Sequence, residues 1–289
     1  MQTVALSWQQ AGGLAAGLGV VGCAMALSHE PHMRKVGAFA RETAVIAALY
    51  GMWQLAGQLA DAGSAGGYRR GHWVYRFEHD WLPLPSEASV QHVIIGHSWV
   101  VEPANLYYAT MHFSMMFVFL FWLFWRHREH YKPVRQVLAW TTLACLLVQL
   151  IPVAPPRLTT GDGIVDLAKV YNQSVYNGFP ADQLSAMPSV HVAWAVLVGW
   201  YTVRISPSRW RWIGAAHTVI TVFVVVATGN HWWLDGIVAV VLLVACAWLV
   251  VGIQALFRAA VRRWRAWRSA GADAPPPEDL LDAAPAASR

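Results

Sequence analysis

The stretch GNHWWLDGIVAVVLLVACAWLVVG, residues 229–252, joins a polar turn to an apolar run that is long enough to cross a bilayer as a helix. The turn carries His231 and, four residues later, Asp235 at the start of the apolar run. A second stretch, AMPSVH at 186–191, brings Ser189 and His191 to the start of another apolar run. Ionisable side chains are costly beside hydrocarbon. The sequence therefore predicts that these two stretches have a chemical task and that the apolar runs form a scaffold around them.

The composition is that of an integral membrane protein. Of the 289 residues, 56% are hydrophobic and only 13% are charged, whereas soluble domains are about a quarter charged. The net charge of +5 does not indicate nucleic-acid binding, because the basic residues cluster beside apolar runs. Cys23, Cys145 and Cys246 lie inside apolar runs without a metal-ligand spacing, so we interpret them as small core residues.

Seven apolar runs have about the length that a membrane-spanning helix needs. We therefore predict an all-α, polytopic membrane helix bundle. The chain then divides into an N-terminal helix and loop (1–41), a membrane domain (42–256) and a basic helix with a disordered tail (257–289). The first of the runs is the weakest, and its composition leaves open whether it spans the membrane. The runs cover residues 11–28, 42–60, 105–125, 136–153, 189–204, 212–229 and 234–256.

Lysine and arginine predict the orientation of the chain in a cell membrane. They follow alternate apolar runs, so with seven spans all four basic groups fall on the cytoplasmic side. The segments 61–104, 154–188 and 229–233 would then face outward. Segment 61–104 mixes tryptophan with charged residues, which is typical of short helices at the membrane interface. Residues 257–268 combine arginine with tryptophan and are expected to continue the last helix along the inner surface.

Two outward-facing pieces carry candidate phosphate ligands. Arg157 ends the run PVAPPR at 152–157, and its planar set of donors suits phosphate oxygens. Ser189 and His191 fall at the start of a helix, where free N–H groups bind anions. Each piece alone also has a structural explanation, namely a snorkelling arginine or a helix cap.

The third piece is the pair His231 and Asp235. If the last helix begins near Asn230, the two side chains share one face, so the carboxylate holds one imidazole nitrogen and leaves the other free to attack. An interfacial pair that caps the helix is the structural alternative. Together the three pieces supply a nucleophile, an acid and phosphate donors, which is the inventory for phosphoryl transfer through a phosphohistidine. No metal is needed, and no acidic cluster nearby completes a magnesium or zinc site.

In chain order, PPR at 155–157, PSVH at 188–191 and HWWLD at 231–235 resemble the three motifs of the type 2 phosphatidic acid phosphatase superfamily. The resemblance covers about residues 105–256. It implies a core of six helices that includes the second span, with the first span as an extra N-terminal helix. It also implies that His231 is the nucleophile, Asp235 its partner and His191 the general acid. Ser189 and Arg157 would bind the phosphate.

The sequence departs from the family pattern at three points. No basic residue occurs at 145–156 before Arg157, no arginine occurs at 222–229, and Val190 replaces the glycine of the second motif. This pattern is closer to the branch that includes inositol phosphorylceramide synthase, which resembles phosphotransferases as well as phosphatases. Asn230, Thr228, Lys169 and the helix N-terminus are candidates to hold the phosphate in place of the missing cations.

Tyr108 and His112 lie four residues apart near the start of the third span, so they share a helix face. They are expected either to line the pocket for the lipid headgroup or to pack as ordinary aromatic residues.

The sequence thus predicts a membrane-bound lipid-phosphate phosphatase or phosphotransferase with its site outside the cytoplasm and without a cofactor. Its partners would be a lipid phosphate in the bilayer and either water or a hydroxyl acceptor. The alternative is a transporter or lipid-binding membrane protein that uses the same residues only to bind phosphate. No inverted repeat is detected in the sequence to support that alternative.

Overall fold

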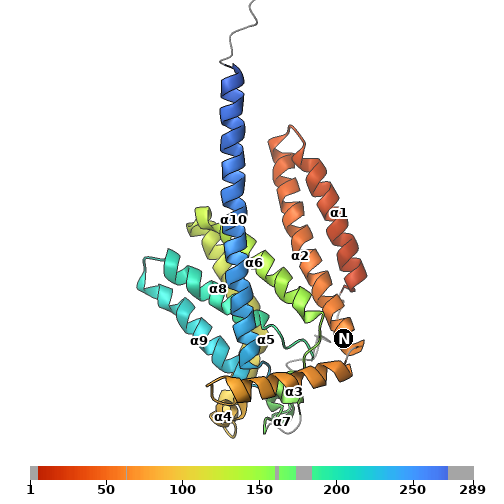
Figure 1. Ribbon diagram of the computed structural model, residues 1–289, viewed down its shortest axis with the longest axis vertical. Helices are drawn as coiled ribbons and strands as arrows, with labels where there is room; N and C mark the ends of the chain where they lie inside the picture. Colours follow the sequence, from red (N-terminus) through yellow and green to blue (C-terminus); the bar gives the residue numbers. More distant parts are fainter. Residues whose placement is uncertain (1–5, 63, 160–162, 174–183, 273–289) are drawn as a thin grey trace, which may run out of the picture. The chain divides into compact units, whose positions relative to one another are not determined.

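The computed structural model describes residues 6–62, 64–159, 163–173 and 184–272. Within these ranges all regular structure is helical, with ten α-helices, two 3₁₀ turns and no strand, so the predicted all-α bundle is confirmed. Seven of the α-helices coincide with the predicted apolar runs (Figure 1). The α-helices are α1 (Trp8–Ala26), α2 (Pro31–Ala62), α3 (Ser64–Trp81), α4 (Glu87–His92), α5 (Ser98–Arg126), α6 (Arg128–Gln149), α7 (Leu167–Val170), α8 (Val190–Ile205), α9 (Trp212–Ala227) and α10 (Trp233–Ala272).

Helices α1 and α2 form an N-terminal hairpin (Figure 1). A capping box starts α1, because Ser7 Oγ accepts a hydrogen bond from the Gln10 N–H and the Gln10 side chain accepts one from the Ser7 N–H. The two helices touch at Gly22 and Gly37, where a Cβ on Gly22 would lie 2.8 Å from the Gly37 carbonyl oxygen. Small residues allow such close helix contacts in membranes. The hairpin provides the extra N-terminal helix that the sequence predicts.

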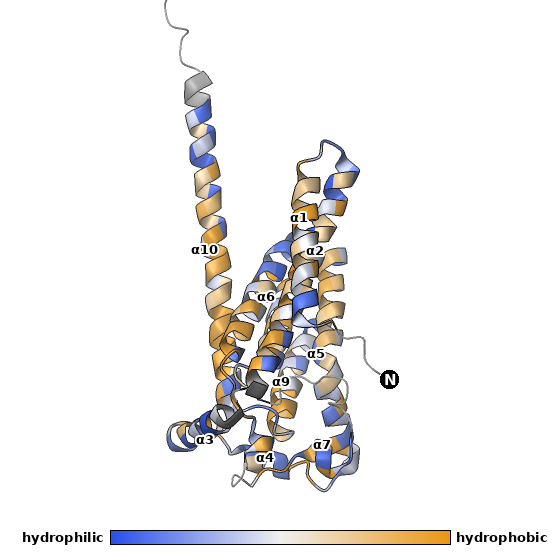
Figure 2. Cartoon of the chain, turned by 90° about the vertical axis from the view of Figure 1, so that its right-hand side faces the viewer, coloured by the Kyte–Doolittle hydropathy of each residue, from blue (hydrophilic) through white to orange (hydrophobic). Residues whose placement is uncertain are grey.

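Within the described ranges, three helical segments are long and apolar enough to cross a membrane: Ser98–Arg126, Arg209–Ala227 and Trp233–Arg268. Helix α8 is also apolar but has only 16 residues. Large apolar side chains point outward, such as Phe117, which is 68% exposed, and exposed apolar residues on helices of this length are typical of a surface in a membrane. Figure 2 shows apolar residues running along these helices. The chain is therefore a multi-pass membrane protein, and the count of seven spans stays a prediction.

Small buried residues hold three of the helices together. Cys145 of α6, Ala193 of α8 and Ala239 of α10 form one cluster in which each residue is fully buried. The indole N–H of Trp194 on α8 donates to Thr142 Oγ1 on α6 at 2.9 Å. The cluster lies near the starts of α8 and α10, so it fixes the polar stretches 186–191 and 229–235 relative to each other.

The polar segment 61–104 forms α3, α4 and the first residues of α5. Helix α3 runs across the ends of its neighbours (Figure 1) and exposes Trp73 and Trp81, which suits a helix at the membrane interface. Polar residues gather in α3, α4 and α7 at this end (Figure 2). Helix α5 begins at Ser98, not near residue 105, because Glu102 and Pro103 in its first turns interrupt the apolar pattern that hydropathy detects.

Helix α3 packs closely on the segment that follows α6. A Cβ on Gly71 would lie 2.8 Å from the carbonyl oxygen of Ala154, so only glycine allows this approach. The Arg70 Nε donates to the carbonyl oxygen of Pro152 at 2.5 Å. These contacts hold residues 152–157, the segment that carries Arg157, against α3.

The chain divides into two compact units, residues 1–246 and 247–289. In the second unit the described residues belong to α10, and the guanidinium of Arg268 lies 5.2 Å from the centre of the Trp264 ring. The predicted disordered tail lies largely outside the described residues, which end at residue 272.

Candidate active site

The three polar pieces of the sequence meet at the end of the bundle that carries α3, α4 and α7. The Ser189 N–H donates to the carbonyl oxygen of Asp235 at 3.1 Å and so ties the second piece to the third. The Arg157 N–H donates to the carbonyl oxygen of Gly229 at 2.9 Å and ties the first piece to the third. Backbone hydrogen bonds between segments far apart in sequence therefore assemble the site.

The turn between α9 and α10 places His231. A Schellman motif ends α9, in which the N–H groups of Gly229 and Asn230 donate to carbonyl oxygens of the last turn at 2.9 and 3.0 Å. Gly229 has a φ of 69°, which is the left-handed conformation that this motif requires. Because the chain reverses here, α10 begins at Trp233, so the condition that the last helix begins near Asn230 is not met. His231 lies in the turn and not on the helix.

The His231 ring is held through its Nδ1 atom. Asp235 reaches back from the first turn of α10, so that its Oδ2 accepts the Trp232 N–H at 2.8 Å and lies 3.3 Å from His231 Nδ1. The carbonyl oxygen of Ala186 is a closer acceptor for the same nitrogen, at 2.8 Å. Two acceptors assign the proton to Nδ1 and leave a lone pair on Nε2. Nε2 is buried and has no hydrogen-bond partner within the described ranges.

His191 lies beside His231 at the start of α8. Ser189 is the N-cap of this helix and is fully buried, and its Oγ accepts the Val192 N–H at 3.3 Å. The His191 ring stacks on Tyr108 with 4.3 Å between ring centroids, and its centroid is 5.6 Å from that of His231. The Nε2 atom of His191 is also buried without a partner in the described part of the chain.

His112 completes a cluster of aromatic rings around His191. Its ring centroid is 4.1 Å from that of His191, and its Nδ1 lies 3.2 Å from the carbonyl oxygen of Tyr108. The structure thus places Tyr108 and His112 next to the two candidate catalytic histidines. Both rings pack against His191 and also lie at the edge of the candidate site.

Arg157 is fixed by side chains from two other segments. Its Nε donates to Asn230 Oδ1 at 2.9 Å, and its Nη1 donates to Asp166 Oδ2 at 3.0 Å. The Asn230 Nδ2 in turn donates to Thr228 Oγ1 at 2.7 Å. Of the candidates proposed to replace the missing cations, Asn230 and Thr228 therefore join the arginine, whereas the Lys169 side chain is exposed.

A family model for the PAP2 superfamily matches residues 72–249, which is more than half of the chain. The chain belongs to the PAP2 superfamily. The match contains all three polar pieces together with Tyr108 and His112. Membership in the PAP2 superfamily makes the chain a phosphatase-type membrane enzyme that acts on phosphate esters. Comparisons with curated proteins and with solved structures found no significant match.

Sequence reasoning missed three acidic residues of this PAP2 site. Asp166 pairs with Arg157, and Glu78 and Glu87 contact the first turn of α10. All three lie in segments that the sequence assigns to loops or to the interface, and no fixed spacing connects them to a motif.

Gly229→Ala should damage both the fold and the site. A Cβ at this position would lie 3.0 Å from Ile164 Cγ2 and 3.2 Å from Arg157 Cβ, on a backbone with positive φ. The left-handed conformation alone costs an alanine about 1–2 kcal/mol. We expect a lower melting temperature in detergent and a reduced kcat, measured on the same preparation. Gly252→Ala is the matched control, because a Cβ there meets nothing within 4 Å; equal behaviour of the two variants would contradict the role of the turn.

Proposed function

We propose that this PAP2 protein transfers the phosphoryl group of a lipid-linked phosphate to His231 and then to water or to another hydroxyl group. The observation that carries the proposal is the pair of adjacent imidazole rings whose Nε2 atoms are buried without partners in the described residues. Buried polar atoms are nearly always hydrogen-bonded, so two such atoms side by side indicate a place for a ligand. A phosphoryl group satisfies both, as an electrophile for one nitrogen and an acceptor for the other.

In the first step, His231 Nε2 attacks phosphorus while the bond to the leaving oxygen breaks. Asp235 and the Ala186 carbonyl oxygen hold the Nδ1 proton and stabilise the positive charge that develops on the ring. His191 starts protonated and gives its proton to the leaving alcohol. In the second step, His191 takes a proton from water or a hydroxyl acceptor, which attacks the phosphohistidine and restores the enzyme.

The phosphate oxygens would be bound by Arg157, by Asn230 and by the N-terminus of α8 beside Ser189. Arg157 is oriented for this task by Asn230 and Asp166, which accept hydrogen bonds from Nε and Nη1. Helix N-termini favour anions. Tyr108 and His112 would then lie on the side of the site that faces the lipid headgroup.

Arg157→Lys should raise the KM for a lipid phosphate by about tenfold, since lysine keeps the charge but loses the planar fork that binds oxygens in pairs. Lysine also cannot bond Asn230 and Asp166 in the same way. Steady-state kinetics in mixed micelles measure the effect. The control is Arg209→Lys, an exposed arginine in the turn before α9. An unchanged KM for Arg157→Lys would contradict a phosphate contact.

The site is proposed to face outward from the cytoplasm. The site lies at the end of the bundle with α3 and α4. The α1–α2 connection, which directly precedes the first basic group (Arg34, Lys35 and Arg41), lies at the other end (Figure 1). The positive-inside rule supports a cytoplasmic location for the basic end. The lipid tail would remain between the helices while the phosphate reaches His231.

The resemblance to the branch of inositol phosphorylceramide synthase supports a hydroxyl acceptor in addition to water. Both reactions share the first step, so the acceptor decides whether the enzyme is a phosphatase or a phosphotransferase.

The function is tested by phosphate release from phosphatidic acid, polyprenyl phosphate and polyprenyl diphosphate, using detergent-purified protein with EDTA present. Release that disappears in His231→Ala supports a metal-independent phosphatase and identifies its lipid. Consumption of a phospholipid only when inositol or another hydroxyl compound is added supports a phosphotransferase. Binding of these lipids without turnover under either condition would overturn the proposal and favour a transporter or lipid-binding protein.

A further inference from the structure

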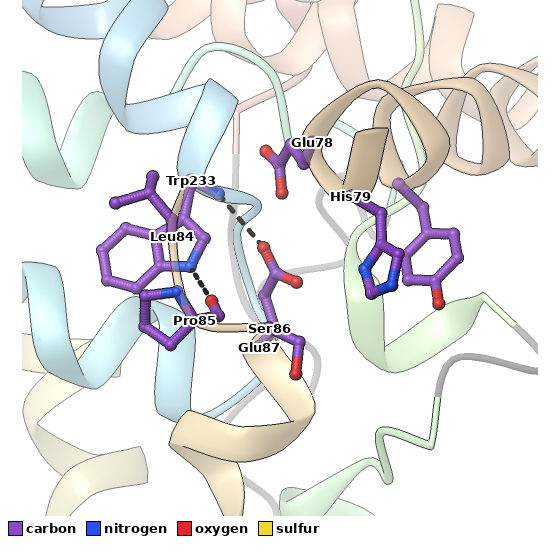
Figure 3. A pocket seen from close by; sticks show the side chains of 8 residues that line it. Glu78, His79, Leu84, Pro85, Ser86, Glu87 and Trp233 are labelled. Atoms are coloured by element: carbon purple, nitrogen blue, oxygen red, sulfur yellow. Dashed lines mark hydrogen bonds between the residues drawn. The ribbon is translucent and has the colours of Figure 1, made fainter. Parts of the chain in front are cut away.

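Two buried carboxyl groups contact the first turn of α10 from outside the three motifs. Glu78 on α3 is 7% exposed and Glu87 on α4 is 4% exposed. Glu78 Oε1 accepts the Leu234 N–H at 2.5 Å. Glu87 Oε1 accepts the Trp233 N–H at 3.5 Å (Figure 3). The first N–H groups of a helix have no partner within the helix. The two carboxyl groups therefore satisfy the N–H groups of Trp233 and Leu234, the two residues before Asp235.

Together with Asp235, the pair occupies three successive N–H groups. Asp235 Oδ2 takes the N–H of Trp232, Glu87 that of Trp233 and Glu78 that of Leu234. The Trp233 indole N–H also donates to the carbonyl oxygen of Pro85 at 2.8 Å (Figure 3). The chain from the catalytic turn into α10 is thus held at every residue, and α3 and α4 provide two of the three carboxyl groups.

The two glutamates must share a proton. They bind adjacent N–H groups, and within the described ranges neither forms an ion pair with lysine or arginine. Two carboxyl groups this close and this buried do not both ionise. Burial, together with the hydrogen bond and the charge of Glu87, raises the pKa of Glu78 from 4.5 to about 10. Glu78 Oε2 is buried and receives no hydrogen bond from any donor among the described residues, which makes it the position for the proton.

The space around the pair does not fit a substrate or a metal ion. The cavity beside Glu78, Glu87 and His79 has a volume of about 20 Å³, which is room for one water molecule and not for a headgroup (Figure 3). In the described part of the chain no group of three or more histidine, cysteine, aspartate or glutamate side chains is arranged to hold a metal ion. Glu78 and Glu87 therefore form a structural link between the interfacial helices α3 and α4 and the turn that carries His231.

We propose that Glu78 and Glu87 are positioning residues that share one proton and clamp the first turn of α10, and thereby hold His231 and Asp235 against the phosphate. The inference rests on the role proposed for His231. A nucleophile displaced by about 1 Å can lose about 100-fold in rate. Through this clamp the packing of α3 and α4 controls kcat although neither helix touches the reacting atoms.

The first test compares Glu78→Gln with Glu78→Leu. Glutamine keeps the acceptor for the Leu234 N–H and donates a hydrogen bond to Glu87 without ionising, so kcat should stay within about threefold of wild type. Leucine has a similar size but no acceptor, so kcat should fall about 100-fold with little change in KM. Asp80→Asn, an exposed carboxylate on the same helix, is the control and should behave as wild type. Equal kcat values for the leucine variant and wild type would overturn the proposal, as would equal loss in the glutamine and leucine variants.

A pH series adds a readout that a merely structural role would not change. Because the folded-state pKa of Glu78 is raised to about 10, its contribution to stability is full below 4.5 and declines as the pH rises to about 10. The ionised Glu78 carboxylate still accepts the Leu234 N–H, but above about pH 10 its charge lies buried beside Glu87, and this repulsion weakens the clamp. The ratio of kcat in Glu78→Gln to kcat in wild type should therefore rise between about pH 9 and pH 11. Glu87 and Asp235 interact with Glu78, and Tyr75 and His79 line its cavity. These four groups are present in wild type and in Glu78→Gln, so their own titration cancels in the ratio of the two kcat values. A constant ratio would count against the shared proton.

Amide hydrogen exchange of the peptide around residues 231–236 separates this inference from the proposed function, because it needs no substrate. We expect faster exchange at residues 233 and 234 in Glu78→Leu and protection in Glu78→Gln. Faster exchange without loss of kcat, in an enzyme that still requires His231, overturns the clamp. Activity that survives in His231→Ala overturns the proposed function instead.

Discussion

His231→Ala and His231→Gln will abolish turnover of the lipid phosphate, with kcat lower by about 10,000-fold or more. The reason is that His231 Nε2 is the proposed nucleophile, and neither alanine nor glutamine forms the phosphorylated intermediate. Glutamine keeps most of the side-chain volume in a site where His231 is 4% exposed, so its melting temperature should stay near that of wild type. Phosphate release and thermal stability in detergent measure the two effects.

A second histidine provides the control for this experiment. His92 lies at the same end of the bundle, on α4, but its side chain is exposed, so His92→Ala should retain full activity. Acid-labile label from a radioactive lipid phosphate should be trapped on wild type and on His92→Ala, and on neither His231 variant. A His231 variant that keeps more than a tenth of the wild-type rate would exclude the phosphohistidine mechanism.

His191→Gln will lower kcat for lipid phosphates by about 100- to 10,000-fold, which is the usual contribution of a general acid. The loss in kcat/KM, which reports the first step, should nearly vanish with nitrophenyl phosphate, because its leaving oxygen needs no proton. This selectivity follows from the position of His191, whose Nε2 is buried without a partner beside the His231 ring. Rates for the two substrates, measured on the same variant, give the result directly.

The neighbouring ring provides a comparison. His112→Gln alters the packing around His191 but not the proposed acid, so its effect on the two substrates should be equal. If His191→Gln loses the same factor in kcat/KM on both substrates, His191 acts in binding or packing and the assignment of the general acid is wrong.

Much of the fold follows from local patterns. Apolar runs of membrane-spanning length predict helices, and each run corresponds to a helix in the structure because hydrocarbon leaves backbone groups no partner outside a helix or barrel. The patterns were less accurate at the ends. Hydropathy placed the start of α5 too late, because its first turns include Glu102 and Pro103. The run from residue 234 lies within one residue of the start of α10 at Trp233, and the turn at Gly229 leaves His231 outside the helix.

The residues of the candidate site could be named from the sequence because their chemistry is rare beside hydrocarbon. A histidine or arginine at the end of an apolar run is costly, and three such pieces in one order resemble a family pattern. The predicted set His231, His191 and Arg157 does come together, with Ser189 and Asp235 linked by a backbone hydrogen bond.

The sequence by itself determined the helical class, the membrane location and the identity of the motif residues, since each depends on composition or on neighbours within a few positions. Only the tertiary structure decided how these residues are held. Asp166 against Arg157, the Ala186 carbonyl oxygen against His231, and Glu78 and Glu87 against α10 are contacts between distant segments. A buried hydrogen bond needs a partner of any suitable type that the fold brings within about 3 Å, and no local pattern specifies which residue that will be.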